Sequence, residues 1–542
     1  MKKKGSTGLI LLILIYVSLG IPNFVWAENQ DMNIMQHKII YGIKGKGEQS
    51  NPYIIKSEND LITISKAVNK GEVDPDSYYF LDSDIELNPG YSFKYIPEYG
   101  LIEVREGLTF VCYIGTENTG EVAFTVKESG TENFYNWDLT SKIYPTVINE
   151  TTMNINGHKL NLWNPIGTKD HPFSGYFQGN NHYINGLFVY KNQYADNESI
   201  GLFGYVKGCD KSQRAQINNI LVCNSFIGCC NYKDIIAGGI AGNVENAIID
   251  SCRNNSNVSN KVTEDGIQTS VGGIVGSLLS YSEVVNCVNS GFISSKSCKV
   301  SCCGGIAGYI GAFSKVNDSY NLGSVVSNSN YRSYSGGIIG AAYYLSEINN
   351  CNNLGKIRSI SDFALNYGFA YSGGISGRLC NSTVDKCHNW GQIYSSCNSS
   401  DSCSGGVAGF SESGTIRNCN NSSNVFSLGG NTVCSGGIVG YALYGELEHS
   451  CNGGKVENVT CGNIACCGGL VGKLEEGKVE CCYNRTEDLH ISVRSGEKFI
   501  GSLFGYVKIK RVWSISKCYY DNTLKTELNP VGNYDKSILE YI

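Results

Sequence analysis

A signature of two glycines, an aliphatic residue, a variable small or aliphatic residue and a third glycine recurs eight times, and it constrains the fold more than any other feature. The copies begin at Gly238, Gly272, Gly304, Gly336, Gly373, Gly405, Gly436 and Gly468. The steps between them are 34, 32, 32, 37, 32, 31 and 32 residues, and degenerate copies flank the array at Gly201 and Gly501. A fixed period in this range indicates a repeat architecture, in which one unit cannot bury its apolar face and neighbouring units must stack.

One repeat, residues 304–330, predicts the structure of a single unit. It contains three short β-prone runs, GGIAGYI, SKVNDSY and GSVVS, separated by turn-forming Gly, Asn and Ser. Three strands per repeat match one coil of a three-sided parallel β-solenoid. We therefore expect an all-β fold of about ten stacked coils.

The first run of each repeat alternates with a period of two, which separates an inner from an outer side. We assign Ile306, Gly308 and Ile310 to the interior, with the glycine where another wall comes close. The position after the last glycine varies freely and is expected to face solvent: Asn243, Ser277, Tyr309, Ala341, Arg378, Phe410, Tyr441 and Lys473. Its aromatic members, Tyr309, Phe410 and Tyr441, are the candidate ligand-binding residues, because flat rings suit sugars or protein partners. The alternative is that these rings only cover their neighbours in the stack.

The chain has 24 cysteines, and one recurs at a fixed place in nearly every repeat. These cysteines are Cys252, Cys287, Cys351, Cys387, Cys419, Cys451, Cys482 and Cys518, with Tyr320 in that place where the cysteine is missing. We expect them to form a buried structural ladder, either as free thiols or with some bridges between coils. Cys209, Cys298, Cys397 and Cys461 lie in loop-like sequence and could pair. Asparagines just before the ladder cysteines should hydrogen-bond between coils.

The segments outside the repeats predict a domain order. Residues 1–27 carry three lysines, an apolar run and small residues before the end, which predicts a signal peptide; a retained membrane anchor is the alternative. A linker (28–48), an N-terminal cap (49–90), a β-rich insertion (91–162), the solenoid (163–520) and a polar tail (521–542) follow. The cap should contain a helix that begins after Ser57 and ends at Gly71.

The glycine signatures, followed by strands such as VVNC and INNC, resemble the GLUG motif repeats of bacterial secreted and surface proteins. The lead-in, with YYFLDSDIELN, WNPIG and PFSGYFQGNNHYINGLFV, is similar as well. The resemblance implies a right-handed β-solenoid on an exported, often adhesin-like protein. Some relatives carry a zinc metallopeptidase domain, but this chain has no His-Glu-x-x-His sequence.

No catalytic constellation is evident, so we expect no enzyme, no cofactor and no metal. Adjacent cysteines such as Cys302 and Cys303 point to opposite sides of a strand and cannot chelate one ion together. Asp250, Asp318 and Asp385 lie on non-adjacent coils, and His182 has a structural role. The net charge is −6, and −9 without the three lysines of residues 1–27, which disfavours nucleic acid as a partner. The expected function is secreted, adhesin-like binding to a host, matrix or glycan ligand, without a membrane span in the mature chain. A polysaccharide-acting enzyme and a scaffold that presents the insertion are the alternatives.

Overall fold

The computed structural model describes most of the chain from Lys38 onward. The described ranges are 38–96, 101–107, 109–115, 124–125, 146–149, 152–155, 158–191, 198–231, 234–262, 268–361, 368–398, 400–460, 462–486, 488–493, 496–508, 515–521 and 528–533. The expected signal peptide, residues 1–27, lies outside these ranges. Within them, no helix has the length and apolar character needed to cross a lipid bilayer.

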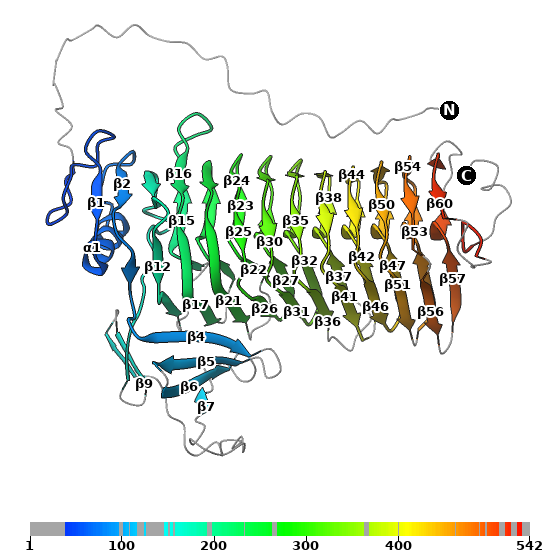
Figure 1. Cartoon of the computed structure of the whole chain (residues 1–542), viewed down its shortest axis with the longest axis horizontal. Helices are drawn as coiled ribbons and strands as arrows, with labels where there is room; N and C mark the ends of the chain where they lie inside the picture. The colour runs from blue at the N-terminus through cyan, green and yellow to red at the C-terminus, as the bar shows by residue number, and fades with distance from the viewer. Residues whose placement is uncertain are drawn as a thin grey trace, which may run out of the picture. The chain divides into compact units, whose positions relative to one another are not determined.

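The repeats form a stack of β-coils, which confirms the predicted all-β solenoid (Figure 1). Four parallel sheets run along the stack, with 13, 20, 10 and 10 strands. Successive coils pair in register one repeat apart, so that Val300 lies beside Arg332 and Gly304 beside Gly336. Each of the two ten-stranded sheets has one strand per coil, which gives ten levels in the described stack.

A single coil contains five short strands rather than the expected three. They are β27 (Val300–Gly304), β28 (Ala307–Ile310), β29 (Lys315–Asn317), β30 (Tyr320–Asn321) and β31 (Val325–Ser329). The first predicted run begins at a corner, its double glycine, and the strand before that corner, β27, was not predicted. The second is divided at Asp318, whose φ of 51° turns the chain. Because an ordinary residue occupies this second corner, the sequence pattern did not reveal it.

Close packing explains why glycine stands at the first corner. A Cβ atom on Gly305 would lie 2.1 Å from the carbonyl oxygen of Gly337 and 2.2 Å from Cγ of Asn321. A Cβ on Gly308 would lie 2.4 Å from the backbone nitrogen of Val271, in the neighbouring wall of the preceding coil. Ile306 and Ile310 are fully buried in the core, as predicted.

A continuous ladder of buried asparagines runs through the interior, two residues after the cysteine position. Asn321 Nδ2 donates to Asn353 Oδ1 at 2.9 Å, and Asn353 Nδ2 donates to Asn389 Oδ1 at 2.8 Å. The members are Asn254, Asn289, Asn321, Asn353, Asn389, Asn421, Asn452 and Asn484. The asparagines before the cysteines also bond between coils, as in Asn350 to Asp318 at 2.6 Å, but at exposed positions.

The cysteine ladder holds seven of its eight predicted members. Cys252, Cys287, Cys351, Cys387, Cys419, Cys482 and Cys518 are buried and carry free thiols. The prediction for Cys451 is wrong: Ser450 takes the inward place and accepts the backbone N–H of Cys419 at 3.1 Å. In its own coil, Ser319 rather than Tyr320 fills the same place, and its hydroxyl accepts from the N–H of Cys287 at 3.2 Å. Serine and cysteine are similar in size, and alternation then turns the next side chain outward.

The N-terminal cap contains the predicted helix, α1 (Glu58–Asn69), with Ser57 and Asp60 forming a capping box. Leu61, Ile64 and Val68 are buried against the first coil. The strand β1 (Tyr53–Ile55) pairs in parallel with β2 (Tyr78–Leu81), which continues into the thirteen-stranded sheet. The helix therefore covers the open edge at the start of the stack.

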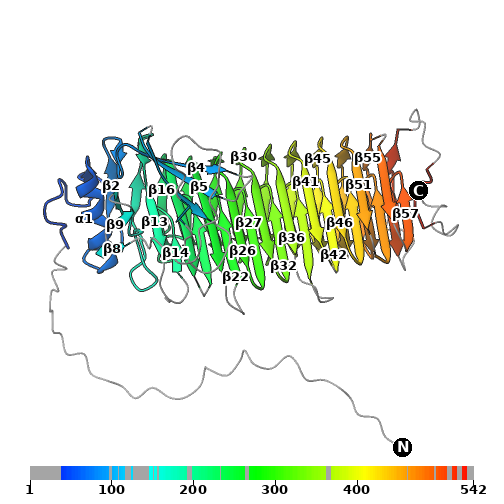
Figure 2. The ribbon, with the colours of Figure 1, turned by 90° about the horizontal axis from the view of Figure 1, so that it is seen from below.

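The insertion contains a small antiparallel sheet of β4 (Tyr91–Ile96), β5 (Leu101–Glu106), β6 (Thr109–Gly115) and β7 (Phe124–Thr125). A second sheet joins β8 (Thr146–Asn149), β9 (Thr152–Ile155) and β10 (His158–Asn161). The first sheet lies beside the early coils (Figure 2). Phe93 of β4 stacks on Phe188 at 5.3 Å, and Phe188 lies 5.6 Å from Phe226.

The twenty-stranded sheet contributes two short strands to each regular coil. In order along the stack the strands are β3 (Ile85–Glu86), β12 (Tyr183–Asn185), β13 (Phe188–Lys191), β17 (Leu221–Asn231), β21 (Arg253–Val262), β25 (Val288–Asn289), β26 (Ile293–Ser297), β30, β31, β35 (Asn352–Asn353), β36 (Ile357–Ser361), β40 (His388–Asn389), β41 (Ile393–Cys397), β45 (Asn420–Asn421), β46 (Val425–Gly429), β50 (Cys451–Asn452), β51 (Val456–Thr460), β55 (Tyr483–Asn484), β56 (Leu489–Val493) and β60 (Tyr519–Tyr520).

Candidate binding surface

The three predicted ligand-binding aromatics do not stand free on the surface. Phe410, in β43 (Ala408–Glu412), is 8% exposed, and Tyr309 and Tyr441 are half-buried. They lie outside the main core. There they pack against the third residue of the strand that ends at the double glycine, which in β27 is Cys302. The buried members of this second apolar cluster, the outer seam, are Cys302, Tyr334, Ala341, Tyr371, Cys403, Phe410, Cys434 and Cys466.

The double-glycine corner accounts for the outer seam. Because the chain turns there, the outer sides of the two flanking strands face one another, and side chains expected in solvent meet. The prediction of a solvent-facing series is therefore wrong for its buried members Asn243, Ser277, Ala341 and Phe410. Cys302 lies in the seam and its neighbour Cys303 in the core, on opposite sides of β27.

The outer seam is stabilised by ring stacking and by cations that lie over its rings, Arg378 among them. Tyr371 stacks on Phe410 at 5.1 Å, and the Arg378 guanidinium lies 5.6 Å from the Phe410 ring. Arg378 also donates to the Tyr334 hydroxyl at 3.2 Å and to Glu412 at 3.1 Å. Burial raises the pKa of Tyr309 and of Tyr441 to about 12 each. The seam is thus a structural cluster of packed rings joined by side-chain hydrogen bonds.

Exposed apolar side chains gather instead at the turns after the strands that carry the variable outward position. These turns join β23 (Val275–Leu279) to β24 (Glu283–Val285), β28 to β29, and β33 (Ile339–Ala342) to β34 (Glu347–Asn349). Each has two consecutive residues at positive φ: Ser280 (54°) and Tyr281 (60°), Ala312 (53°) and Phe313 (62°), Tyr344 (57°) and Leu345 (59°). Turns with this backbone normally use Asn-Gly or Gly-Gly.

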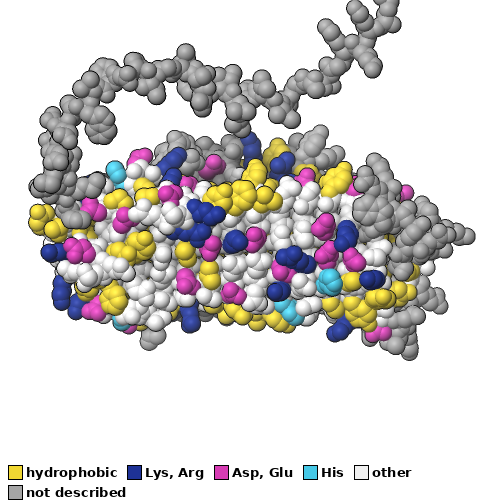
Figure 3. Space-filling model, turned by 90° about the horizontal axis from the view of Figure 1, so that it is seen from above, with side chains coloured by type: hydrophobic (Ala, Val, Ile, Leu, Met, Phe, Trp, Pro, Cys, Tyr) yellow, Lys and Arg dark blue, Asp and Glu magenta, His cyan; other side chains and the backbone are white. Residues whose placement is uncertain are grey.

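These turns form one ridge on three consecutive coils. The exposed fractions are 38% for Tyr281, 45% for Phe313, 65% for Tyr344 and 61% for Leu345. The Tyr281 and Phe313 rings stack at 5.2 Å with an interplanar angle of 7°, and Lys211 Nζ lies 4.7 Å from the Tyr281 ring. We call these five residues the turn ridge. Seen from above, this side of the stack shows hydrophobic side chains in groups among charges of both signs (Figure 3).

The ridge is fixed in place by hydrogen bonds between coils. The Tyr281 N–H donates to the Ala312 carbonyl at 2.9 Å, and the Phe313 N–H donates to the Tyr344 carbonyl at 3.1 Å. Its backbone conformation costs about 1–2 kcal/mol for each residue with a Cβ atom. Other coils turn at a single residue here, such as Asn381 (45°) or Ser413 (50°). Folding alone therefore does not explain bulky apolar residues at the ridge.

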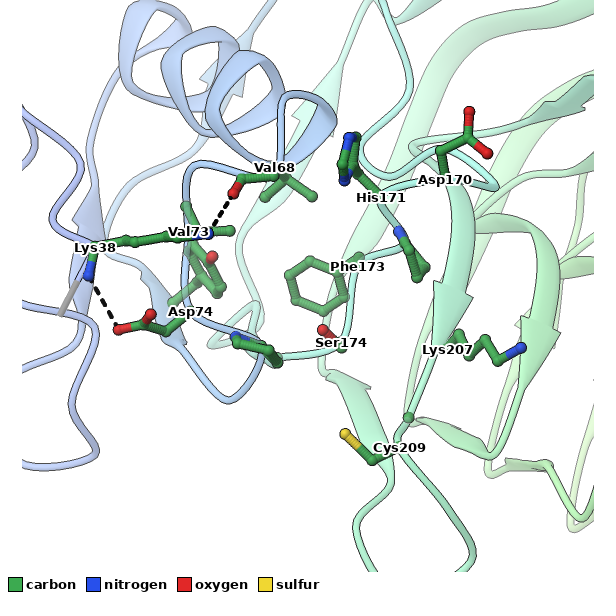
Figure 4. A pocket seen from close by; sticks show the side chains of 16 residues that line it. Lys38, Val68, Val73, Asp74, Asp170, His171, Phe173, Ser174, Lys207 and Cys209 are labelled. Carbon is green, nitrogen blue, oxygen red and sulfur yellow. Dashed lines mark hydrogen bonds between the residues drawn. The ribbon is translucent and has the colours of Figure 1, made fainter. Parts of the chain in front are cut away.

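A hollow of about 410 Å³ lies beside the C-terminal end of α1 (Figure 4). Phe173 and Tyr79 line it, and Cys209 reaches solvent at its edge. Its cations already have partners: Lys38 Nζ donates to the Gly71 carbonyl at 2.8 Å, and Lys207 pairs with Glu245 at 3.1 Å. The hollow offers no convergent set of free polar groups.

The three aspartates named in the sequence analysis each accept a hydrogen bond from an asparagine of the next coil. Asp250 accepts from Asn286 at 3.1 Å, Asp318 accepts from Asn350 at 2.6 Å, and Asp385 accepts from Asn418 at 2.8 Å. His182 Nδ1 lies 2.9 Å from Asp84 Oδ1. Among the residues that the structure describes, no three His, Cys, Asp or Glu side chains are placed to hold one metal ion.

Comparison with known proteins does not assign the chain to a family. No family model matches the chain, and no curated protein matches it. A solved structure described as a "putative immunoglobulin A1 protease from Bacteroides ovatus" aligns with it over 86% of this chain and 85% of that chain. The identity is 14% and the TM-score is 0.28, so this similarity carries no argument about the activity of the chain.

Proposed function

We propose that the chain is an exported, non-enzymatic repeat protein of the GLUG kind, which binds a host or matrix protein or a glycan in an adhesin-like way. The turn ridge is its contact surface. The observation that carries the proposal is the presence of Tyr281, Phe313 and Leu345 at exposed, left-handed turn positions. Strain at such positions is typical of functional sites. The charge and apolar pattern of residues 1–27 supports export.

The ridge geometry favours a protein ligand over a stacked sugar. Tyr281 and Phe313 each cover one face of the other ring, and Lys211 Nζ lies over the Tyr281 ring, so these ring faces are not open to a sugar. Sugars stack on open ring faces, whereas stacked apolar rings fit an apolar groove on a partner.

The experiment compares the native chain with the triple variant Tyr281→Asn, Phe313→Asn, Leu345→Asn. Pull-down of matrix and host surface proteins and a glycan array are run side by side. We expect protein binding at least tenfold weaker for the variant. Tyr519→Asn, which changes a 60% exposed ring far from the ridge, is the matched control and should bind normally. Equal binding by the triple variant would exclude the ridge as the contact surface.

A second candidate, in which the solenoid presents the insertion to a partner, rests on the anchoring of β4 through the Phe93–Phe188 stack. Deletion of residues 91–162 separates the two. Binding that survives the deletion and requires Tyr281 supports the ridge. Binding lost with the insertion alone supports the second candidate.

A further inference from the structure

The outward side of the twenty-stranded sheet, which we call the broad face, exposes a second group of apolar side chains away from the turn ridge. Leu322 and Leu354 are each 49% exposed, and Trp390 is 47% exposed. These three side chains occupy the same place on consecutive coils, because the N–H of Leu354 donates to Asn321 and that of Trp390 donates to Asn353. Exposed apolar side chains in adjacent places mark a binding surface.

The same face already binds a β-sheet at its N-terminal end. There Phe93 of β4 packs on Phe188, whose ring meets Phe226. Farther along the stack the small sheet of the insertion no longer covers the face. The uncovered part therefore continues an existing sheet-on-sheet interface.

The order of side chains along this face is self-complementary. One row reads Leu322, Leu354, Trp390, Ser422, Gly453 and Arg485, with large apolar residues in its first half and small residues next to them. The neighbouring row reads Val326, Arg358, Tyr394, Phe426, Glu457 and His490. In both rows, the two inner pairs of positions about the midpoint between the third and fourth coils have complementary residue types: large with small in the first row, and ring with ring and cation with anion in the second.

We propose that the broad face binds a second copy of this chain in an antiparallel homodimer. The twofold axis lies in the interface, parallel to the strands, between β41 and β46. A half-turn about it seats Trp390 over the partner's Ser422 and Leu354 over the partner's Gly453. It also brings Tyr394 to the partner's Phe426.

Charge follows the same symmetry. Arg358, now held 5.0 Å from the Tyr394 ring, comes opposite the partner's Glu457. The pairing occurs twice because the interface is isologous. Lys356 comes opposite the partner's Lys455, whose charge is already balanced by Asp488 at 3.1 Å and Glu457 at 3.7 Å.

The described strands of the insertion do not obstruct this arrangement. Coils pair across the interface in order of their distance from the axis. The nearest pair is β40/β41 with the partner's β45/β46, followed by β35/β36 with β50/β51, β30/β31 with β55/β56, and β25/β26 with β60, where the described stack ends. The small sheet packs against β17 and β21, which precede these strands. It therefore lies beyond the partner's last described coil.

Charge exchange tests the proposal with the full mature chain. Light scattering after size exclusion at about 20–100 μM should give twice the mass of the chain, because that range exceeds the dissociation constants usual for specific dimers. Arg358→Glu alone and Glu457→Arg alone should each shift the protein to monomer, with at least a tenfold weaker dimer. The double variant should restore the dimer. Lys315→Glu, a charge change in the separate thirteen-stranded sheet, is the matched control and should remain dimeric.

A cross-link gives an independent readout. Arg358→Cys combined with Glu457→Cys should form a dimer between chains under mild oxidation, while either cysteine alone should not. A native chain that is monomeric throughout the range would overturn the proposal. So would a dimer that both single charge variants leave intact, or one that the double variant fails to restore.

Discussion

Asn353 shows how much one buried residue contributes to the interior of each coil. Its side chain accepts from Asn321 at 2.9 Å, donates to Asn389 at 2.8 Å and donates to the Gly355 carbonyl at 3.0 Å. Asn353→Ala leaves several of these partners buried without a bond, at about 1–3 kcal/mol each. We expect a loss of about 3 kcal/mol or more in the free energy of unfolding, measured by urea denaturation. Asn352→Ala, one residue away on the outward side, should change it by less than about 0.5 kcal/mol.

Half-buried tyrosines make the fold sensitive to alkaline pH. Burial raises the pKa of Tyr309 and of Tyr441 to about 12 each, against about 10 in an unfolded chain. The folded state binds the phenol protons more tightly than the unfolded state. The resulting contribution to the free energy of unfolding is therefore complete below pH about 10 and is lost as pH rises through about 12. The urea midpoint should fall over that interval.

Replacing both phenols tests this pH dependence. Tyr309→Phe with Tyr441→Phe should make the fall in the urea midpoint shallower. Tyr519→Phe, at an exposed ring, should leave the slope unchanged. A double variant with the native slope would show that these two phenols do not titrate differently on unfolding.

At the scale of elements, the turn ridge should be less stable than a turn designed only to fold. Ser280→Asn with Tyr281→Gly gives this turn the residues that its backbone favours. We expect stabilisation of about 1–2 kcal/mol, seen as a higher Tm, together with weaker ligand binding. Asn381→Ala, which removes a favourable residue from a left-handed corner, should lower Tm. A ridge variant that loses stability would argue against stored strain.

The sequence predicts these elements unevenly, for physical reasons. The helix α1 was predictable because Ser57 and Asp60 form a local capping box. The inward side of β28 was predictable from its period of two. The outer seam was not, because it exists only once the corner at Gly304 brings two strand faces together. Nor was the ridge, since nothing in the residue types Tyr281 and Phe313 signals a left-handed backbone.

The ladders show the same limit at single positions. The repeat period places a cysteine near the second corner, and seven of these cysteines are buried there. Period alone does not distinguish Ser450 from Cys451, and only the hydrogen bond of Ser450 to the Cys419 N–H fixes which one faces inward. The buried Asn321 ladder was missed because asparagine is common at turns throughout the chain.

At the scale of the whole molecule, each coil contacts mainly its neighbours, so stability should be close to a sum over coils. Deletion of residues 405–435 removes one complete repeat of 31 residues and joins equivalent positions. The shortened chain should stay folded, with a β-type circular dichroism spectrum and a modestly lower urea midpoint. Deletion of residues 405–419 removes about half a repeat and places inward side chains on the outside. It should abolish folding, and a folded product would contradict the additive description.

The hydrogen bonds that join successive coils also determine how the molecule would respond to tension. They run along the stack, so a pull between its two ends loads one coil boundary after another instead of the whole core at once. Each boundary that yields releases about 32 residues, or about 110 Å of extended chain at about 3.4 Å per residue. A stack of this kind is an extensible tether, which lengthens in steps of nearly equal size while its remaining coils stay folded.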